Sequence, residues 1–179
     1  MLGALTMVAI AAGPPATQDW VDLARYAGRW YEIARLPNRF QERCAGDVAA
    51  TYTLRADGRV TVLNECRKSN GSIARAEGVA RPAEEAGPAS RLKVRFAPAW
   101  LSFLPLVWGD YWILELDADY RHALVGDPSR KYLWILSRTA ELNDAEYASL
   151  VAAAERKGFD VGGLRRTPHR PTPQPVARR

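Results

Sequence analysis

Two strand-like segments near opposite ends of the chain constrain its fold more than any other feature. The first, residues 28–34, reads GRWYEIA, and the second, residues 132–139, reads YLWILSRT. Apolar or aromatic side chains recur at alternate positions in both, as in half-buried β-strands. In a closed antiparallel barrel the first and last long strands become neighbours. We therefore expect the Arg138 guanidinium to lie flat on the Trp30 indole at one end of a barrel.

Short strand-like stretches separated by turn signals fill the region between these segments. The sequence predicts strands over residues 29–36, 47–55, 59–66, 72–80, 90–97, 109–117, 121–126 and 131–138. Strands of this length and spacing are typical of an all-β barrel or sandwich. Residues 56–58 read Ala-Asp-Gly, which fits a three-residue hairpin loop and places Tyr52 opposite Val62.

Two helical segments are expected on either side of the strands. Asp22 is a candidate N-cap for a turn of helix that precedes the first strand. Asn143 or Asp144 can cap a longer helix that ends at Gly158. This helix has one apolar face to bury against the outer wall of the barrel, formed by Tyr147, Leu150, Val151 and Ala154.

The ends of the chain differ from the domain expected over residues 19–166. Residues 1–18 comprise an apolar run that resembles a secretory signal without its positively charged start, followed by a proline-containing linker. The alternative is a frayed, mildly apolar terminus. No cysteine follows the run, so the sequence does not predict a lipid anchor there. Residues 167–179 are rich in proline and arginine and are expected to be disordered.

The net positive charge of the chain lies in its C-terminal tail. The formal net charge is +5, and residues 165–179 contain five arginines and no acid, so the rest of the chain carries no net charge. A nucleic-acid-binding domain would carry its basic face on the folded part. The sequence therefore argues against a nucleic-acid partner.

The two cysteines, Cys44 and Cys66, are an even number in a chain that we expect to be exported. One disulfide is the favoured interpretation, and two independent buried thiols are the alternative. Two cysteines with two histidines elsewhere are too few for a metal site, and we expect no cofactor.

Three motifs, in this order, resemble those of the lipocalin family. They are Gly28-x-Trp30, Leu116-Asp117-x-x-Tyr120 and Ser137-Arg138, and the flanking residues look most like the branch of bacterial outer-membrane lipocalins and apolipoprotein D. The resemblance covers residues 20–165. It implies an eight-stranded antiparallel up-and-down barrel with one C-terminal α-helix packed on its outside. Gly28, Trp30, Asp117, Tyr120 and Arg138 would then close the barrel and have no catalytic role.

Strand parity predicts which side chains line the inside of such a barrel. If Arg138 reaches Trp30, alternate residues of each strand face inward. Val94 and Phe96 alternate along their strand with Lys93 and Arg95, which are then expected to face water. The alternative is a barrel filled by its own side chains. The predicted inward residues are Ala50, Tyr52, Leu54, Val60, Val62, Val94, Phe96, Tyr111, Ile113, Trp134 and Leu136.

The open end of the barrel would carry two unusual loops. Both cysteines map there, and a disulfide would pin the long loop between the first two strands to the rim. Residues 98–108 form an apolar loop at the same end. This loop either folds into the cavity mouth, contacts a membrane or a partner, or packs on itself under the first loop.

The family resemblance implies binding, storage or transport of a small hydrophobic ligand, such as a fatty acid or lysophospholipid, in envelope maintenance. The location would be periplasmic or associated with the outer membrane. One alternative is an enzyme in which Glu32 and Glu115 meet as a buried acid pair, although a single buried Glu bonded to Tyr or Arg is the simpler interpretation. The other alternative is a tetrapyrrole carrier, for which no axial ligand is evident.

Overall fold

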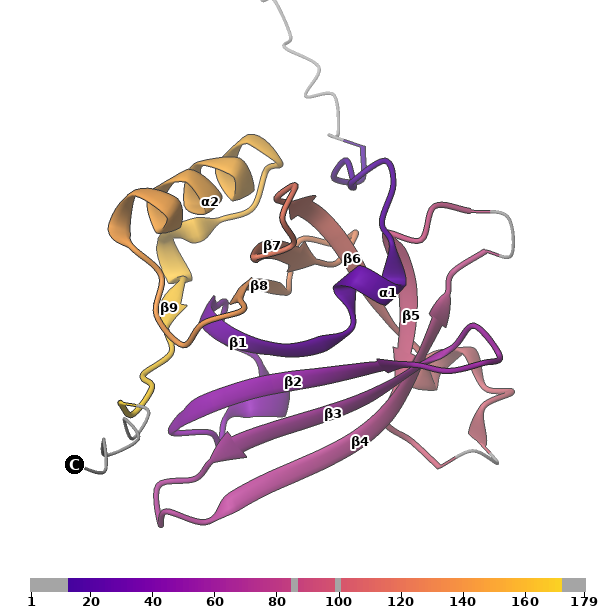
Figure 1. Cartoon of the computed structure of the whole chain (residues 1–179), viewed down its shortest axis with the longest axis horizontal. Helices are drawn as coiled ribbons and strands as arrows, with labels where there is room; N and C mark the ends of the chain where they lie inside the picture. Colours follow the sequence, from indigo (N-terminus) through magenta and orange to yellow (C-terminus); the bar gives the residue numbers. More distant parts are fainter. Residues whose placement is uncertain (1–12, 85–86, 99–100, 172–179) are drawn as a thin grey trace, which may run out of the picture.

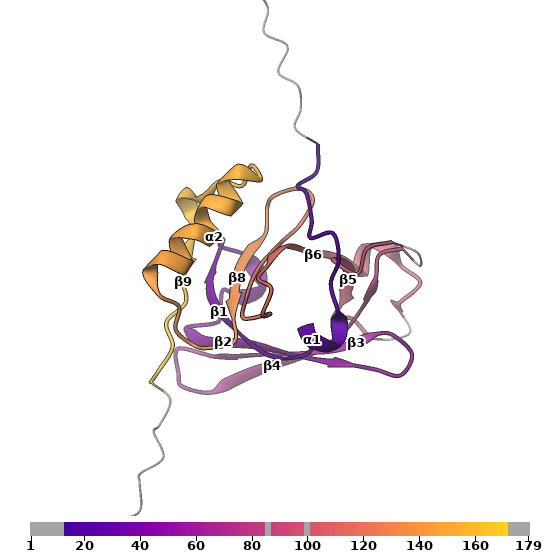
Figure 2. The same cartoon turned by 45° about the horizontal axis from the view of Figure 1, so that its top comes forward.

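The computed structural model describes residues 13–84, 87–98 and 101–171, and it shows a closed antiparallel barrel (Figures 1 and 2). Each strand pairs with the next, and β1 pairs with both β2 and β8, which closes the barrel. This confirms the predicted eight-stranded fold. The barrel strands are β1 (Gly28–Arg35), β2 (Gly46–Leu54), β3 (Val60–Arg67), β4 (Ile73–Pro82), β5 (Arg91–Arg95), β6 (Gly109–Leu116), β7 (His122–Gly126) and β8 (Leu133–Ser137).

A ninth strand, β9 (Arg165–Arg166), extends the sheet beyond β1 and was not predicted. The next residue, Thr167, is buried, and its backbone N–H donates to the Ile33 carbonyl. Arg170 then donates to the Asp47 carboxylate. The packed chain therefore continues past the expected boundary at residue 166, and the expected disorder is wrong for residues 167–171. Residues 172–179, like residues 1–12, lie outside the described part.

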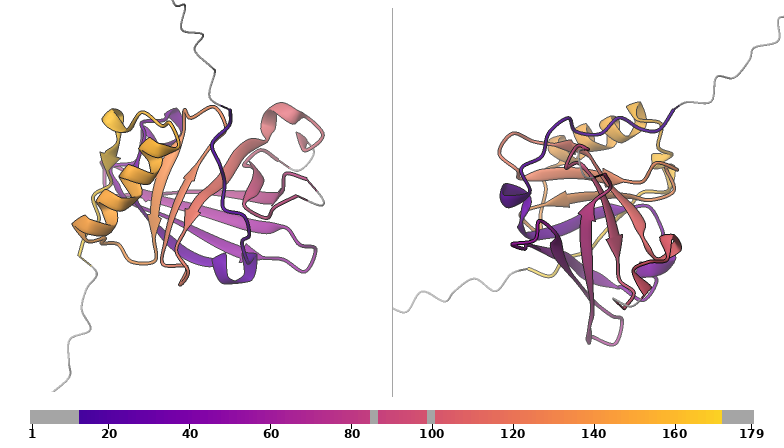
Figure 3. Two further views of the ribbon diagram at one scale, coloured as in Figure 1. Left: turned by 90° about the horizontal axis from the view of Figure 1, so that it is seen from above. Right: turned by 90° about the vertical axis from the view of Figure 1, so that its right-hand side faces the viewer.

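The helices begin where the capping signals predict. The Asp22 carboxylate accepts from the backbone at the start of α1 (Leu23–Tyr26), and the Asn143 side chain does so for α2 (Asp144–Arg156). Helix α2 lies on the outside of the barrel (Figure 3). The described chain also has three short 3₁₀ helices: η1 (Arg39–Gln41), η3 (Pro105–Val107) and η4 (Val161–Gly163).

The barrel wall separates two apolar cores. Ala123, Val125 and Leu136 face inward and pack with Trp30. Their strand neighbours face outward and pack under α2, as strand alternation requires. The outer core comprises Ile33, Ala34, Leu36, Leu114, Leu124, Leu133, Ile135, Ala153, Ala154 and Phe159.

Trp30 and Arg138 close one end of the barrel. The Arg138 guanidinium carbon lies 3.9 Å from the centroid of the Trp30 ring, which is fully buried and donates its indole N–H to the Tyr26 carbonyl. Gly28 leaves room for this stack, because a Cβ there would lie 3.1 Å from Arg138 Nη1 and the backbone has a φ of +99°.

The turn between β6 and β7 is tied to the same end. The Asp117 carboxylate accepts from the backbone N–H groups of Arg121 and His122. Burial would raise the pKa of Asp117, but these hydrogen bonds outweigh it and lower the pKa. The Tyr120 hydroxyl accepts from the backbone N–H of Asp22 at 2.9 Å. This contact connects the turn to the start of α1.

Among the described residues, no helix has the length and apolar character needed to cross a membrane.

Candidate ligand-binding site

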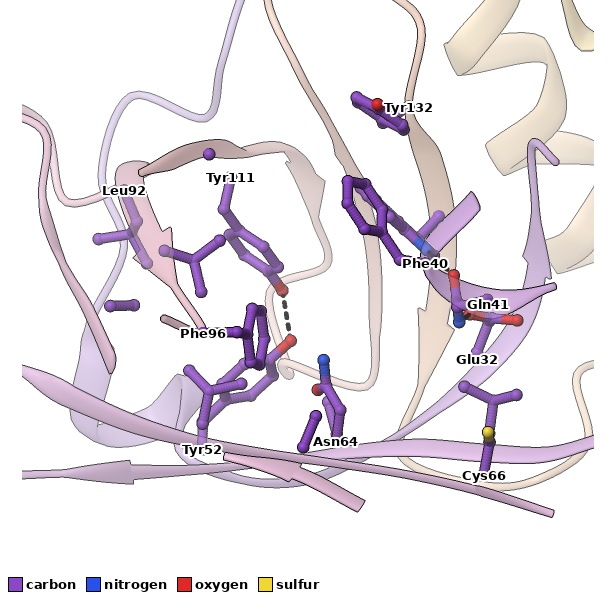
Figure 4. A pocket seen from close by; sticks show the side chains of 18 of the residues that line it. Glu32, Phe40, Gln41, Tyr52, Asn64, Cys66, Leu92, Phe96, Tyr111 and Tyr132 are labelled. Atoms are coloured by element: carbon purple, nitrogen blue, oxygen red, sulfur yellow. Dashed lines mark hydrogen bonds between the residues drawn. The ribbon is translucent and has the colours of Figure 1, made fainter. Parts of the chain in front are cut away.

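A cavity of about 750 Å³ occupies the barrel between α1 and the loops at the other end (Figure 4). Its size is typical of a site for one small molecule. The barrel is therefore not filled by its own side chains. Most of the predicted inward residues line the cavity: Ala50, Tyr52, Val60, Val62, Val94, Phe96, Tyr111, Trp134 and Leu136.

Two of the residues predicted to line the cavity do not. Ile113 points inward but is fully buried in the inner core with Trp30, so it lies beyond the cavity toward the closed end. Leu54, the last residue of β2, is 39% exposed and does not line the cavity, although Val60 opposite it does. Parity gives the face of a strand but not how far along it the cavity extends.

Arg95 was expected to face water, and it is 7% exposed. Its side chain is on the outer face, as parity requires, but the chain after β5 covers it. Its guanidinium donates to the Ala97 carbonyl and lies 5.3 Å from the Trp108 ring centroid. The expectation failed because strand parity takes no account of a loop that folds back over the wall.

Several lining residues were missed by the sequence analysis. Leu92 has the parity of Val94 on β5, so alternation alone would have identified it. Tyr26 comes from α1, and Phe40 and Gln41 come from η1, where strand parity does not apply.

A buried carboxylate holds the loop between β1 and β2 over the cavity. Glu32, 3% exposed, forms an ion pair with Arg35 Nη1 at 2.5 Å. It also accepts from Gln41 Nε2 and from the Thr167 hydroxyl. Gln41 Oε1 in turn accepts from the Trp134 indole N–H at 2.9 Å. These contacts fix η1 against the barrel (Figure 4).

The predicted meeting of Glu32 with Glu115 is wrong. Glu115 pairs with Lys157, just after α2, at 3.1 Å. A register shift between Ile113 and Glu115 interrupts the alternation of β6, which explains why parity failed at this residue. Glu32 is instead a buried Glu bonded to Arg, as in the simpler interpretation.

The structure joins Cys44 to Cys66 in a disulfide with a Cα–Cα distance of 5.6 Å. Cys44 follows η1, and Cys66 lies near the end of β3. Both residues border the cavity. The loop over the mouth is therefore fixed twice, by the disulfide and by Gln41.

The apolar loop before β6 forms the other side of the mouth. Leu106, Val107 and Trp108 line the cavity. Phe103 is 74% exposed and Leu106 is 84% exposed, so these two apolar side chains are not buried in a core formed by the loop itself. Residues 99–100 lie outside the described part.

Three phenol hydroxyls meet inside the cavity. The Tyr111 hydroxyl lies 2.9 Å from that of Tyr52 (Figure 4). It also lies 2.8 Å from that of Tyr26. Burial raises the pKa of Tyr52 to about 12 and raises the pKa values of the other two well above their ordinary range. All three groups are therefore uncharged at neutral pH.

The described chain contains no group of three or more His, Cys, Asp or Glu side chains placed to hold a metal ion. Neither histidine lines the cavity. His122 lies 3.6 Å from Glu146, and His169 contacts the backbone carbonyl of Glu32.

The model of the lipocalin-like domain matches residues 21–169. The chain belongs to the lipocalin family. This lipocalin is 49% identical to temperature-induced lipocalin-1 of Arabidopsis thaliana over 154 aligned residues. The alignment covers 86% of this chain and 82% of that protein. It is 43% identical to the outer membrane lipoprotein Blc of Escherichia coli, over 78% of this chain and 75% of that protein. Apolipoprotein D of Macaca fascicularis is 35% identical, over 72% of this chain and 66% of that protein.

Solved structures agree on the fold of this lipocalin. Insecticyanin from the tobacco hornworm Manduca sexta superposes with a TM-score of 0.67 at 20% identity, over 89% of this chain and 86% of that chain. At that identity the likeness shows the fold alone.

Proposed function

We propose that this lipocalin binds and carries a small hydrophobic ligand, a fatty acid, lysophospholipid or similar lipid, in its barrel cavity. The cavity of about 750 Å³ lined mainly by aliphatic and aromatic side chains carries this proposal. Such a lining favours an apolar chain, since its burial releases water from apolar surface on both partners. The polar head group of the ligand is proposed to lie at the mouth of the cavity.

The proposed setting is the cell envelope, outside the cytoplasm. A disulfide fixes the loop over the cavity, and disulfides persist in oxidising compartments such as the periplasm. One relative is an outer membrane lipoprotein. We propose a role in lipid maintenance at that membrane.

A binding titration tests the proposed ligand class. Delipidated protein is titrated with a fluorescent fatty acid, and lysophospholipid is then added as a competitor. We expect saturable binding with one site per chain and displacement by the competitor. Native mass spectrometry of the protein before delipidation is expected to show a bound species in the lipid mass range. Fluorescence that rises without saturation, together with an empty protein, would contradict the proposal.

The apolar rim, defined as Phe40, Phe103 and Leu106, is proposed to contact a lipid bilayer when ligand is exchanged. Each of these side chains is more than half exposed, and they lie on the two loops that border the cavity mouth. Exposed apolar side chains gathered at one opening are costly in water unless they meet an apolar surface. Contact here would let a lipid pass from the bilayer into the barrel.

Vesicle flotation tests this contact. We expect Leu106→Glu to reduce the fraction that floats with phospholipid vesicles. The matched control is Trp20→Glu, because Trp20 is 67% exposed and lies on the segment before α1, away from the mouth. Equal losses in both variants would show that the rim has no special part in membrane contact.

A further inference from the structure

The cluster of three phenols in the cavity contains more hydrogen-bond donors than it uses. Tyr26, Tyr52 and Tyr111 bring three O–H groups together, and two hydroxyl–hydroxyl contacts join them. Each contact consumes one proton, because a hydroxyl has a single O–H donor. Whichever way the protons are arranged, one of the three is left without an acceptor among these hydroxyls, and the described residues supply no other hydrogen bond to them.

The position of the cluster makes this unused donor costly. Tyr26 is 3% exposed and Tyr52 is 7% exposed, yet all three residues line the cavity. A buried hydroxyl without a partner loses its hydration and gains nothing in exchange. Tyr26 also packs on Trp30, with ring centroids 4.9 Å apart, which places the cluster at the closed end of the cavity. An oxygen that accepts one hydrogen bond would satisfy it.

The chemistry of the cluster favours an uncharged oxygen. The phenols remain protonated at neutral pH because burial raises their pKa values. One free donor is enough for a ketone or hydroxyl oxygen. A buried carboxylate would need several donors or a cation to offset its desolvation. The negative charge of Glu32 also contributes to raising the pKa of the Tyr52 phenol.

We infer that Tyr26, Tyr52 and Tyr111 form a subsite that binds an uncharged hydroxyl or carbonyl oxygen at the inner end of the ligand. The subsite rests on the proposed binding of a hydrophobic ligand and narrows its class. The preferred ligand is apolar along its length and carries an oxygen at its buried end, as in a chain hydroxylated at its terminus or a ring system bearing a ketone.

A pair of matched ligands tests the subsite. Palmitate and 16-hydroxypalmitate share the same chain and carboxylate and differ in one terminal hydroxyl. Each is titrated into delipidated protein by calorimetry. We expect the hydroxylated ligand to bind about fivefold more tightly, in line with one net hydrogen bond. A purely apolar closed end would reverse this order, because the hydroxyl would be desolvated without a partner.

The triple variant Tyr26→Phe/Tyr52→Phe/Tyr111→Phe is the informative one, since it removes all three hydroxyls and keeps the rings, whereas any single change would leave at least one O–H group free. We expect it to abolish the preference for 16-hydroxypalmitate while palmitate still binds. Tyr132→Phe is the matched control, because Tyr132 also lines the cavity but lies near the mouth, stacked on Trp134. It should preserve the preference.

The outcomes separate the two proposals. Palmitate binding without a preference for the hydroxylated chain, or a preference that the triple variant leaves intact, would overturn the subsite and leave the proposed function standing. Failure of both ligands to bind the wild-type protein would overturn both.

Discussion

At the scale of single residues, Arg138 shows how one side chain closes the barrel. Its guanidinium covers Trp30 and donates to the backbone carbonyls of Arg25, Tyr26, Arg29 and Tyr120. These carbonyls belong to three segments, the end of α1, the start of β1 and the turn before β7. A planar group with donors on all sides satisfies them together, which a single ammonium cannot do.

We therefore expect Arg138→Lys to lower the free energy of unfolding by about 2 kcal/mol, although the charge is kept. Urea unfolding followed by tryptophan fluorescence measures the change. Arg121→Lys is the control, because Arg121 is largely exposed and pairs with acids at the surface. It should change stability by less than about 0.5 kcal/mol. Equal effects in the two variants would contradict the role of the guanidinium geometry.

The Asp47 carboxylate makes the stability of the fold depend on pH. Burial would raise its pKa, but the backbone N–H of Arg170 and the side chains of Arg67 and Arg170 hold the pKa at about 2, below its ordinary value of 3.8. The folded state therefore favours the charged form. This contribution to stability is complete above about pH 4 and is lost as the pH falls from there to about 2.

Asp47→Asn is expected to cost about 1 kcal/mol at pH 7, a value reduced for screening because Arg170 is largely exposed. The difference from wild type should shrink as the pH falls to 2. Urea unfolding at pH 7, 4 and 2 measures it, with the exposed Asp119→Asn as control. A difference that is the same at all three pH values would contradict the assignment.

At the scale of elements, the loop between β1 and β2 depends on its disulfide. Cys44 and Cys66 are 22 residues apart, and a cross-link over that distance restricts the unfolded chain by about 3 kcal/mol. We expect the variant with both cysteines changed to serine to lose about that much stability in urea unfolding. Wild-type protein under reducing conditions should lose a similar amount. A loss below about 1 kcal/mol in both would show that the unfolded chain is already restricted there.

The elements also show what the sequence can and cannot predict. Alternation identified the strands and the face of Trp134 and Tyr52, because the barrel wall imposes a period of two on each strand. It could not predict that Gln41 reaches Glu32 and Trp134, since the conformation of a loop depends on contacts far away in the sequence. The same limit applies to Arg95, which a neighbouring loop covers.

At the scale of the whole molecule, the C-terminal tail shows that composition also fails to predict contacts with distant parts of the chain. Residues 165–171 are rich in proline and arginine, yet they pack along β1. Thr167 and Arg170 find acceptors in Glu32 and Asp47, which are over a hundred residues away. Composition describes what a segment can bury by itself, whereas these contacts are supplied by the finished barrel.

Ligand binding inside the barrel should also stabilise the whole fold. A ligand that binds only the folded state at a hundred times its dissociation constant raises the free energy of unfolding by about 2.7 kcal/mol. Ala76 and Glu77 are neighbours on β4 that face opposite sides, with Ala76 lining the cavity and Glu77 exposed. They therefore form a matched pair for placing a large side chain inside or outside the barrel.

We expect Ala76→Trp to fill the cavity and remove most of the stabilisation by a bound fatty acid, whereas Glu77→Trp should retain it. The measurement is the shift in urea midpoint on addition of ligand to each protein. Comparing each variant with its own ligand-free form removes any direct effect of the substitution on stability. A full shift in Ala76→Trp would contradict ligand binding inside the barrel.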